Sequence, residues 1–324
     1  MTNSSIAQNS VSYLDISPEQ AEQRIDNFLV THLKGVPKSH IYRILRTGEV
    51  RINKGRIKPT YRIKAGDVLR LPPLAFRTNT PISLKMAVGK ELKNAILHED
   101  AHLLVINKPA GMAVHGGSGI NGGIIEFLRL LFPNAPYLEL VHRLDRETSG
   151  CLMIAKKRSM LRRLHELLLN RDVHKQYLTL VQGRWNPRLL RVEAPLHKNI
   201  LQSGERMVRV SPKGKPAISQ FSIEQQFATT TLLRVQPQTG RTHQLRVHTA
   251  YKGHPIAGDD KYGDEKFNLK MRQQYTLKRL FLHAEQLSFE LPAINYRLSI
   301  HAPLPTALQQ VLNRLNGPYV EKMF

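Results

Sequence analysis

A single carboxylate lies in a basic stretch near the middle of the chain. Residues 140–150 read LVHRLDRETSG, and Asp145 lies between Arg143 and Arg146. A carboxylate can serve as a nucleophile or a base, and neighbouring guanidinium groups favour its ionised form and attract anions. The stretch therefore indicates an ionised carboxylate that acts on an anionic substrate. A structural alternative stays open, in which Asp145 and Thr148 form a turn that leads into the next strand.

The whole chain carries an excess of positive charge. Its 324 residues include 48 Lys and Arg against 25 Asp and Glu, a formal net charge of +23. This balance favours a polyanionic partner, either a nucleic acid or an acidic membrane surface. No apolar run approaches the ~18 residues of a spanning helix, so we expect no membrane partner. The single cysteine, Cys151, excludes an intramolecular disulfide and is compatible with a cytoplasmic location.

Other candidate motifs lack essential residues. HGGSGINGG does not end in the Gly-Lys-Ser/Thr of a nucleotide-binding loop, and HRLDRE has no companion kinase motifs. TGRTHQLRVH contains His243 and His248, which we expect on a strand and therefore on opposite faces. A metal needs three or four converging ligands, so we predict no metal site and no cofactor. The functional side chains of this segment are then Arg241 and Arg246.

The chain divides into four predicted parts. They are an N-terminal mobile tail over 1–16, a small domain over 17–72, a linker over 73–94 and a larger domain over 95–324. In the small domain, SPEQAEQRIDNFLVTHL predicts a helix with Ser17 as its N-cap, and PKSHIYRILRTG predicts a second helix that ends at Gly48. EVRIN, KGRIKPTYRIK and AGDVLRLP alternate apolar and polar residues and predict strands.

The small domain is strongly basic. Between Lys34 and Arg70 there are eleven Lys and Arg but only two acidic residues. A solvated basic surface is the simpler alternative, but cations grouped on one helix face and on the following β segment favour RNA binding through phosphates. The side chains predicted to bind RNA are Lys38, Arg43, Arg46, Arg51, Lys54, Arg56 and Lys58.

The larger domain has many predicted strands and few helices. Short strands are predicted in AILHED and HLLVINKP, and helices in IIEFLRLLFP and SMLRRLHELLLN. Further strands are predicted in CLMIAK, KQYLTLVQG, AISQFSIEQQF, TTLLRVQP, HQLRVHTAYKG and LSFELP. This pattern predicts an α+β domain with a large, mostly antiparallel mixed sheet flanked by helices and loops.

Taken together, these motifs resemble the RluA-type pseudouridine synthases. HRLDRETSG is similar to the central motif of that family. NKPAGMAVHGG lies ahead of it, and KQYLTLV and TGRTHQLRVH…GHPIAGDDKYG come after it, in the family's order. The likeness covers 95–303, and the small domain resembles an S4-type RNA-binding domain from end to end. HGGSG and LHKNILQSGERMVRVS are similar to segments of members that act on ribosomal RNA of the large subunit.

The resemblance implies a reaction and a set of site residues. The reaction is isomerisation of uridine to pseudouridine in RNA, and the implied partner is 23S ribosomal RNA, free or in an assembling particle. Asp145 is implied as the catalytic carboxylate, Tyr177 as a stacking face and proton-transferring hydroxyl, and Arg241 as the arginine paired with Asp145. Arg143 is implied to fill the space left by a flipped-out nucleotide. We expect a monomeric cytoplasmic enzyme without a cofactor.

Two other classes of function remain open at the level of sequence. A non-catalytic S4-type ribosome assembly factor would keep the basic domain but would not need Asp145, Tyr177 and Arg241 together. A DNA-binding regulator would be expected to contain a helix-turn-helix and a dimerisation signature, and we find neither in the sequence.

Overall fold

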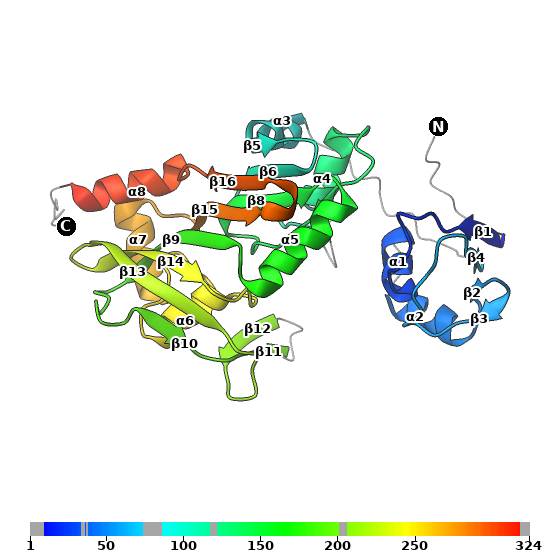
Figure 1. Cartoon of the computed structure of the whole chain (residues 1–324). Helices are drawn as coiled ribbons and strands as arrows, with labels where there is room; N and C mark the ends of the chain where they lie inside the picture. The colour runs from blue at the N-terminus through cyan, green and yellow to red at the C-terminus, as the bar shows by residue number, and fades with distance from the viewer. Residues whose placement is uncertain are drawn as a thin grey trace. The chain divides into compact units, whose positions relative to one another are not determined.

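The computed structural model describes residues 10–33, 36, 38–73, 86–116, 122–200 and 206–317. The chain forms two compact units that divide between Ser83 and Leu84 (Figure 1). Each unit has its own apolar core, so each is described by itself.

The first unit packs two helices against a small antiparallel sheet of order β1-β4-β2-β3. Its elements are β1 (Ser12–Asp15), α1 (Ile25–His32), α2 (Lys38–Arg46), β2 (Arg51–Ile52), β3 (Gly55–Arg56) and β4 (Val68–Leu71). Both helices and the sheet contribute to one core, because Leu29, Ile44 and Leu69 are fully buried within the same cluster. The second predicted helix and its end at Gly48, where φ is +75°, are confirmed.

Three predictions for this unit are wrong. Residues 12–15, expected in a mobile tail, form β1 and pair with β4. The first helix begins at Ile25 rather than after Ser17, because Glu22 has a φ of +66° that interrupts a helical backbone. The Ser17 amide instead donates to the Gln20 side chain across a turn. The strand predicted in KGRIKPTYRIK is confined to β3.

The second unit is built on one large mixed sheet of order β10-β13-β14-β9-β15-β8-β6-β5, with β16 paired to β15 and β7 to β8. Only the β15–β8 pair is parallel among these described strands, so the mostly antiparallel sheet is confirmed. The strands are β5 (Ile96–Glu99), β6 (Leu103–Lys108), β7 (Glu139–Leu140), β8 (Ser149–Ala155), β9 (His174–Gln182), β10 (Arg191–Glu193), β13 (Ile218–Gln226), β14 (Thr230–Pro237), β15 (Leu282–Leu291) and β16 (Tyr296–His301). β11 (Leu196–Ile200) and β12 (Arg206–Val210) form a separate hairpin.

Helices pack on this sheet through separate apolar cores. They are α3 (Met86–Asn94), α4 (Ile124–Leu131), α5 (Arg158–Asn170), α6 (Gln244–Tyr251), α7 (Glu265–Tyr275) and α8 (Thr306–Asn316), with a short 3₁₀ helix η1 (Pro292–Ile294) (Figure 1). Leu164 of α5 packs with Met153 of β8, whereas Leu128 of α4 packs with Leu152 of β8 in a different cluster. Since successive strand residues point to opposite faces, α5 and α4 cover opposite faces of the sheet.

Two predictions for the second unit are wrong. The predicted linker over 73–94 contains α3, whose fully buried Leu92 belongs to the same core as α4. HQLRVHTAYKG, predicted as a strand, forms α6. Every residue over 244–249 is buried, so the alternation of Leu245 and Val247 with polar residues does not mark two faces of a strand.

Candidate active site

Asp145 lies in the loop between β7 and β8, and the buried Lys108 side chain anchors that loop by hydrogen bonds. The Lys108 Nζ donates hydrogen bonds to the carbonyls of Pro109, Met112 and Arg146 at 2.7, 2.8 and 2.9 Å. Burial lowers the pKa of Lys108 to about 7, but three carbonyl acceptors match the three N–H donors of an ammonium group. The loop backbone next to Asp145 is thereby fixed to the end of β6.

A chain of hydrogen bonds fixes the residues that follow Asp145. The Arg279 Nη2 donates to the Ser149 hydroxyl at 2.8 Å, which lies 2.9 Å from the His283 Nδ1. The His283 Nε2 lies 3.0 Å from the Ala302 carbonyl, which can only accept, so Nε2 donates and Nδ1 accepts from Ser149. Burial lowers the pKa of His283 to about 4, so the imidazole is neutral near pH 7.

Gly150 permits the close approach of β8 and β15 beside this chain of bonds. Its φ is +111°, and a Cβ there would collide with the backbone of Ala284. Ala284 pairs with Gly150 in the parallel β15–β8 pair and with Tyr177 in the β15–β9 pair. The glycine of HRLDRETSG therefore brings the Asp145 loop and the Tyr177 strand onto adjoining parts of the sheet.

Two side chains from the start of α6 face the Asp145 carboxylate, whose side chain is 19% exposed. The Arg246 Nη1 lies 3.8 Å and the His243 Nε2 lies 3.9 Å from the Asp145 Oδ2. The turn that contains Asp145 is closed by its backbone, since the Thr148 amide donates to the Asp145 carbonyl at 3.1 Å. The carboxylate is thus directed at α6.

Asp259 and Tyr262 hold the Arg246 side chain in place. Its Nε and Nη2 donate to the two carboxylate oxygens of Asp259, each at 2.7 Å, and its guanidinium carbon lies 5.1 Å from the ring centroid of Tyr262. Burial disfavours the charge of Asp259 most strongly, but the hydrogen bonds and positive charge of Arg246, together with the backbone amides of Tyr262 and Lys261, outweigh burial and lower the pKa of that carboxyl. The remaining Nη1 is the nitrogen that faces Asp145, so Asp259 and Tyr262 orient the cation toward it.

The predicted pairing of Arg241 with Asp145 is wrong. The Arg241 side chain is exposed, and its Nε donates to the Pro216 carbonyl at 3.0 Å. The guanidinium that lies within ion-pair distance of Asp145, among the residues the structure describes, belongs to Arg246. The error arose because residues 244–251 were predicted as a strand. In the structure they form α6, and this helix directs Arg246 toward Asp145.

Tyr177 lies on β9 and is partly buried between two apolar clusters of the second unit. Burial raises the pKa of Tyr177, and the negative charge of Asp145 raises it further. The phenol is therefore neutral near pH 7. Its hydroxyl makes no hydrogen bond within the described residues, which leaves it available to a ligand.

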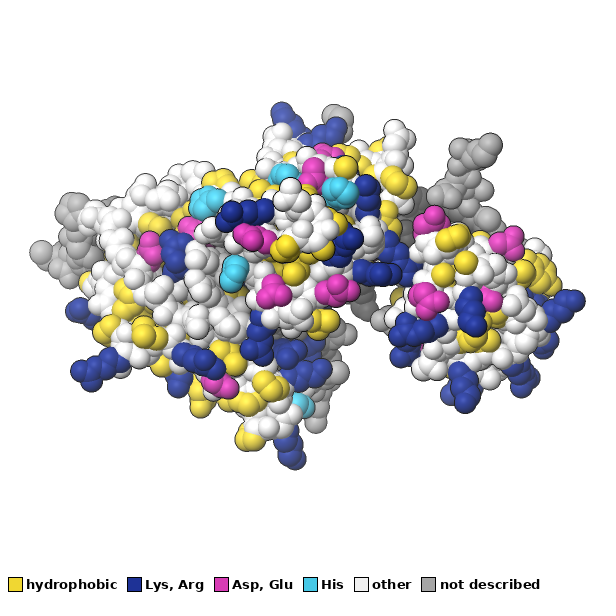
Figure 2. Space-filling view, viewed as in Figure 1, with side chains coloured by type: hydrophobic (Ala, Val, Ile, Leu, Met, Phe, Trp, Pro, Cys, Tyr) yellow, Lys and Arg dark blue, Asp and Glu magenta, His cyan; other side chains and the backbone are white. Residues whose placement is uncertain are grey.

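The other predicted RNA contacts lie on the surface. Arg143 is exposed beside Asp145, and Lys and Arg side chains gather on the visible face of the first unit (Figure 2). The Lys38 side chain lies outside the described residues. The remaining predicted contacts of that unit are all exposed: Arg43, Arg46, Arg51, Lys54, Arg56 and Lys58.

The histidines of the TGRTHQLRVH segment have separate roles. His243 is the residue before α6, with its Nδ1 2.7 Å from the Tyr262 hydroxyl, whereas buried His248 contacts Ser219 and the Ala194 carbonyl. No three His, Cys, Asp or Glu side chains in the described ranges could share a metal ion. Within the same ranges, no helix combines the length and apolarity needed to cross a membrane.

Comparisons with known proteins identify the family. A model of the RNA pseudouridylate synthase family matches residues 102–251, and an S4 domain model matches residues 23–69. Ribosomal large subunit pseudouridine synthase C of Escherichia coli (strain K12) is 55% identical over 95% of this chain and 98% of its own length. The protein of that name from Pasteurella multocida (strain Pm70) is 55% identical over 96% of this chain and 95% of its own length.

A solved structure agrees with the sequence relatives. Human RNA pseudouridylate synthase domain containing 4 superimposes with a TM-score of 0.59 at 30% identity, over 71% of this chain and 95% of the human chain. The family model spans the segment that includes the Asp145 loop, Tyr177 and the start of α6. The relatives extend over both units, and the S4 domain coincides with the first unit. The chain therefore belongs to the RNA pseudouridylate synthase family.

Proposed function

We propose that this RNA pseudouridine synthase isomerises uridines in ribosomal RNA of the large subunit, with Asp145 as the catalytic carboxylate. The observation that carries the proposal is the orientation of Arg246, which Asp259 holds by two hydrogen bonds so that Nη1 faces Asp145 at 3.8 Å. The names of the relatives support the substrate class. The proposal extends to 23S ribosomal RNA, free or in an assembling particle, and to a monomeric cytoplasmic enzyme.

The reaction rearranges bonds within one nucleotide. The N1–C1′ bond breaks, the uracil turns, and C5 bonds to C1′, while the proton lost from C5 is balanced by the proton gained at N1. Asp145 supplies a carboxylate to the ribose or the uracil, and Arg246 holds a positive charge 3.8 Å from it. A base within an RNA helix must leave the stack to reach Asp145, and exposed Arg143 is placed to hold the neighbouring phosphates.

The assay for the proposed function uses the full chain. The protein is incubated with transcripts that together cover the large-subunit ribosomal RNA, and pseudouridine is mapped by carbodiimide treatment and primer extension. We expect modification at a small number of uridines. Modification confined to small-subunit or transfer RNA transcripts would contradict the proposed substrate class. A protein that binds large-subunit RNA but modifies no transcript or assembling particle would support the S4-type assembly factor instead.

Tyr177→Phe is expected to reduce the single-turnover rate by about 10²-fold or more, with little change in RNA affinity. Phenylalanine keeps the flat face on which uracil stacks but loses the hydroxyl. Because burial raises the pKa of Tyr177, wild-type protein should show no alkaline limb from a tyrosinate below pH 9. The measurements are single-turnover rates from pH 6 to 9 and equilibrium RNA binding.

Tyr13→Phe provides the control for this change, since Tyr13 is 68% exposed on β1 of the first unit. The control should leave both rate and affinity unchanged. Equal turnover of Tyr177→Phe and wild type would limit Tyr177 to stacking and packing.

Removal of residues 1–83 is expected to weaken RNA binding more than it slows catalysis. The second unit has separate cores, so the truncated chain should stay folded. Each lost contact to a single-stranded phosphate should flatten the log–log salt dependence by about 0.7. Single-turnover kinetics over a range of RNA and salt concentrations test this division of labour. An unchanged affinity and salt slope would mean that the basic surface is only solvated, and normal binding without turnover would place the first unit in the active site.

A further inference from the structure

Strands β9 and β14 separate immediately beside Tyr177. Their pairing runs from Thr230 opposite Gln182 to Val235 opposite Tyr177 and stops there. Beyond that pair, β9 continues to His174 against β15, and β14 continues to Pro237 against β13. The two strands thus run on without pairing to each other, and we call the space between them the strand split.

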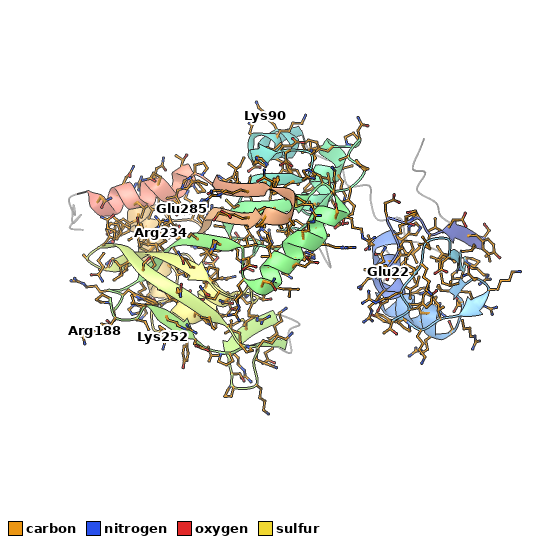
Figure 3. All side chains as sticks on the ribbon, in the orientation of Figure 1. Glu22, Lys90, Arg188, Arg234, Lys252 and Glu285 are labelled. Atoms are coloured by element: carbon orange, nitrogen blue, oxygen red, sulfur yellow. The ribbon has the colours of Figure 1, made fainter. Side chains whose placement is uncertain are left out.

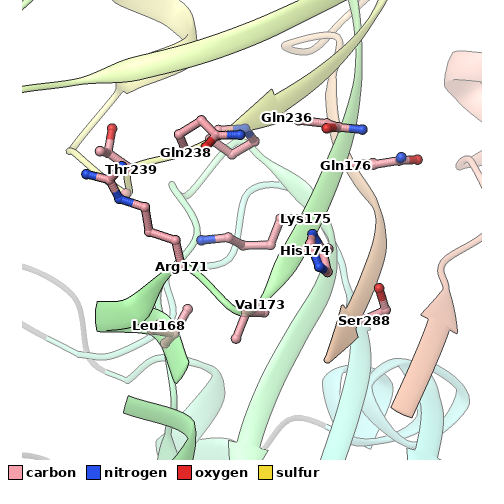
Figure 4. Close-up of a pocket in the computed structure, with 12 residues that line it drawn as sticks. Leu168, Arg171, Val173, His174, Lys175, Gln176, Gln236, Gln238, Thr239 and Ser288 are labelled. Atoms are coloured by element: carbon pink, nitrogen blue, oxygen red, sulfur yellow. The ribbon is translucent and has the colours of Figure 1, made fainter. Parts of the chain in front are cut away.

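A cavity of about 280 Å³ occupies the strand split (Figure 4). This volume is near the lower end of the range for ligand sites, about 300 Å³. Its lining includes two cations and several amides, and it contains no carboxylate. The side chains that carry the argument are Arg171, Lys175 and Gln238.

Lys175 gives the cavity an unbalanced positive charge. Its ammonium makes no hydrogen bond or ion pair with any residue that the structure describes, although the side chain is partly buried. The same charge acts on the Asp145 loop, because burial lowers the pKa of His142 to about 3 and Lys175 contributes to that shift. A partly desolvated cation without a partner is best satisfied by an anionic ligand.

The position of Lys175 relates the cavity to the candidate active site. Lys175 and Tyr177 are two residues apart on β9, so their side chains leave the same face of the strand about 7 Å apart. A ligand at the cavity therefore lies beside a base that stacks on Tyr177. One nucleotide step along an RNA strand can span this separation.

The amides at the cavity do not all share one face of the sheet. Gln176 leaves the face of β9 opposite to Lys175 and Tyr177, and its Oε1 accepts there from the Arg234 Nη1 at 3.2 Å; Arg234 is in turn paired with Glu285, which lies close to it in Figure 3. The base contact is therefore assigned to Gln238, which follows the end of β14. The Gln238 amide nitrogen of the main chain donates to the Ile218 carbonyl at 3.0 Å, which fixes the position from which its side chain extends. Carboxamides offer both donors and acceptors, as base edges do.

We propose that the strand split binds the RNA nucleotide adjacent to the target uridine, with its phosphate at Lys175 and Arg171 and its base edge at the Gln238 amide. This inference rests on the proposed function and deepens it, since it assigns a sequence-reading role to a part of the sheet next to the active site. The positive charge and the absence of carboxylates in the lining fit a phosphate, and the Gln238 amide fits a base.

The phosphate contact is tested with Lys175→Met and a charge-matched control, Lys266→Met, on the exposed side of α7. The substrate is an RNA stem-loop that carries the mapped target uridine. We expect Lys175→Met to raise the RNA concentration for half-maximal single-turnover rate about tenfold and to flatten the salt slope by about 0.7. The rate at saturating RNA should fall much less, and Lys266→Met should change neither quantity.

The base contact is tested by a double-mutant cycle. An abasic ribose is placed in turn on each side of the target uridine, and Gln238→Ala is combined with each RNA. At one of the two positions, the abasic sugar and Gln238→Ala should each weaken binding about tenfold, and together no more than either alone. Thermal unfolding of each variant confirms that the fold is retained, and if Lys175→Met fails to fold, Lys175→Gln and Gln238→Ala carry the test.

Wild-type affinity and salt slope in Lys175→Met, or additive losses at both flanking positions, would overturn the strand split as a nucleotide site. This result is distinct from failure of the proposed function. In the first case wild-type protein still forms pseudouridine in the stem-loop, whereas in the second case it modifies no large-subunit RNA. The proposal would also be overturned if Lys175→Met weakened binding and flattened the salt slope while Gln238→Ala showed no coupling to an abasic sugar on either side of the target. The site would then be only a contact with the RNA backbone.

Discussion

Asp145→Asn is expected to abolish pseudouridine formation while the fold and RNA affinity remain close to those of wild type. Asparagine keeps the size of the side chain but cannot act as an anionic nucleophile or base. We expect a loss of at least about 10³-fold in single-turnover rate, or about 4 kcal/mol of barrier. The fold should tolerate the change because Arg246 keeps its two bonds to Asp259 when the longer contact to Asp145 is lost.

Glu147→Gln is the matched control, since it removes a carboxylate from the same loop. Glu147 is about half-exposed, and its carboxylate lies 3.5 Å from the Arg146 Nε. Its charge also favours the charged forms of Lys108 and Arg279, so thermal unfolding of this variant checks that the loop is retained. Single-turnover rates, equilibrium binding and thermal unfolding of both variants make up the measurement. If Asp145→Asn keeps more than about a tenth of the wild-type rate, the carboxylate is not the essential group.

The sequence was sufficient to predict elements whose pattern reflects one buried face. Strands β6, β8 and β14 were found from their apolar residues, and α5 from the helical spacing that places Leu164 in its core. The helix α6 was not predicted from its sequence, because its residues are buried on all sides. A periodic pattern reports the boundary between core and solvent, and α6 has no such boundary over 244–249.

Two further elements depend on contacts that are distant in sequence. β1 is four residues long, and its Tyr13 is exposed, so its strand conformation depends on pairing with β4 more than fifty residues later. α3 was assigned to a linker because it follows a proline-containing polar stretch, yet Leu92 packs into the core formed by α4 and the sheet. Tertiary pairing decides the structure of β1, whereas MAVGKELKN of α3 contains several good helix formers and its helix was accessible to sequence analysis.

Part of the candidate site was also beyond the sequence. The Asp145 loop and Tyr177 were singled out, and both lie in the second unit next to the β15 backbone. The bond from Arg246 to Asp259 was not predicted, although GHPIAGDDKYG contains both Asp259 and Tyr262. Spacing along the chain could not show that the loop containing Asp259 and Tyr262 contacts the start of α6. A general signal was present, since a buried arginine needs a carboxylate partner and Asp259 was a nearby candidate.

The correction from Arg241 to Arg246 leads to the second large effect. Arg246→Met should reduce the single-turnover rate by about 10²-fold or more, because it removes the cation that lies 3.8 Å from the Asp145 carboxylate. Arg241→Met is the matched control and should leave the rate nearly unchanged, since exposed Arg241 contacts the Pro216 carbonyl.

Arg246→Met also leaves Asp259 as a buried charge without its partner, because the Asp259 side chain is 0% exposed. Breaking such a pair costs about 3–5 kcal/mol of stability, so loss of rate in this variant alone could reflect unfolding. The double variant Arg246→Met/Asp259→Asn removes the buried charge and should recover much of the unfolding free energy without recovering the rate. Recovery of rate together with stability would show that Arg246 acts only on the fold, and a loss of rate in Arg241→Met but not in the double variant would return the role to Arg241.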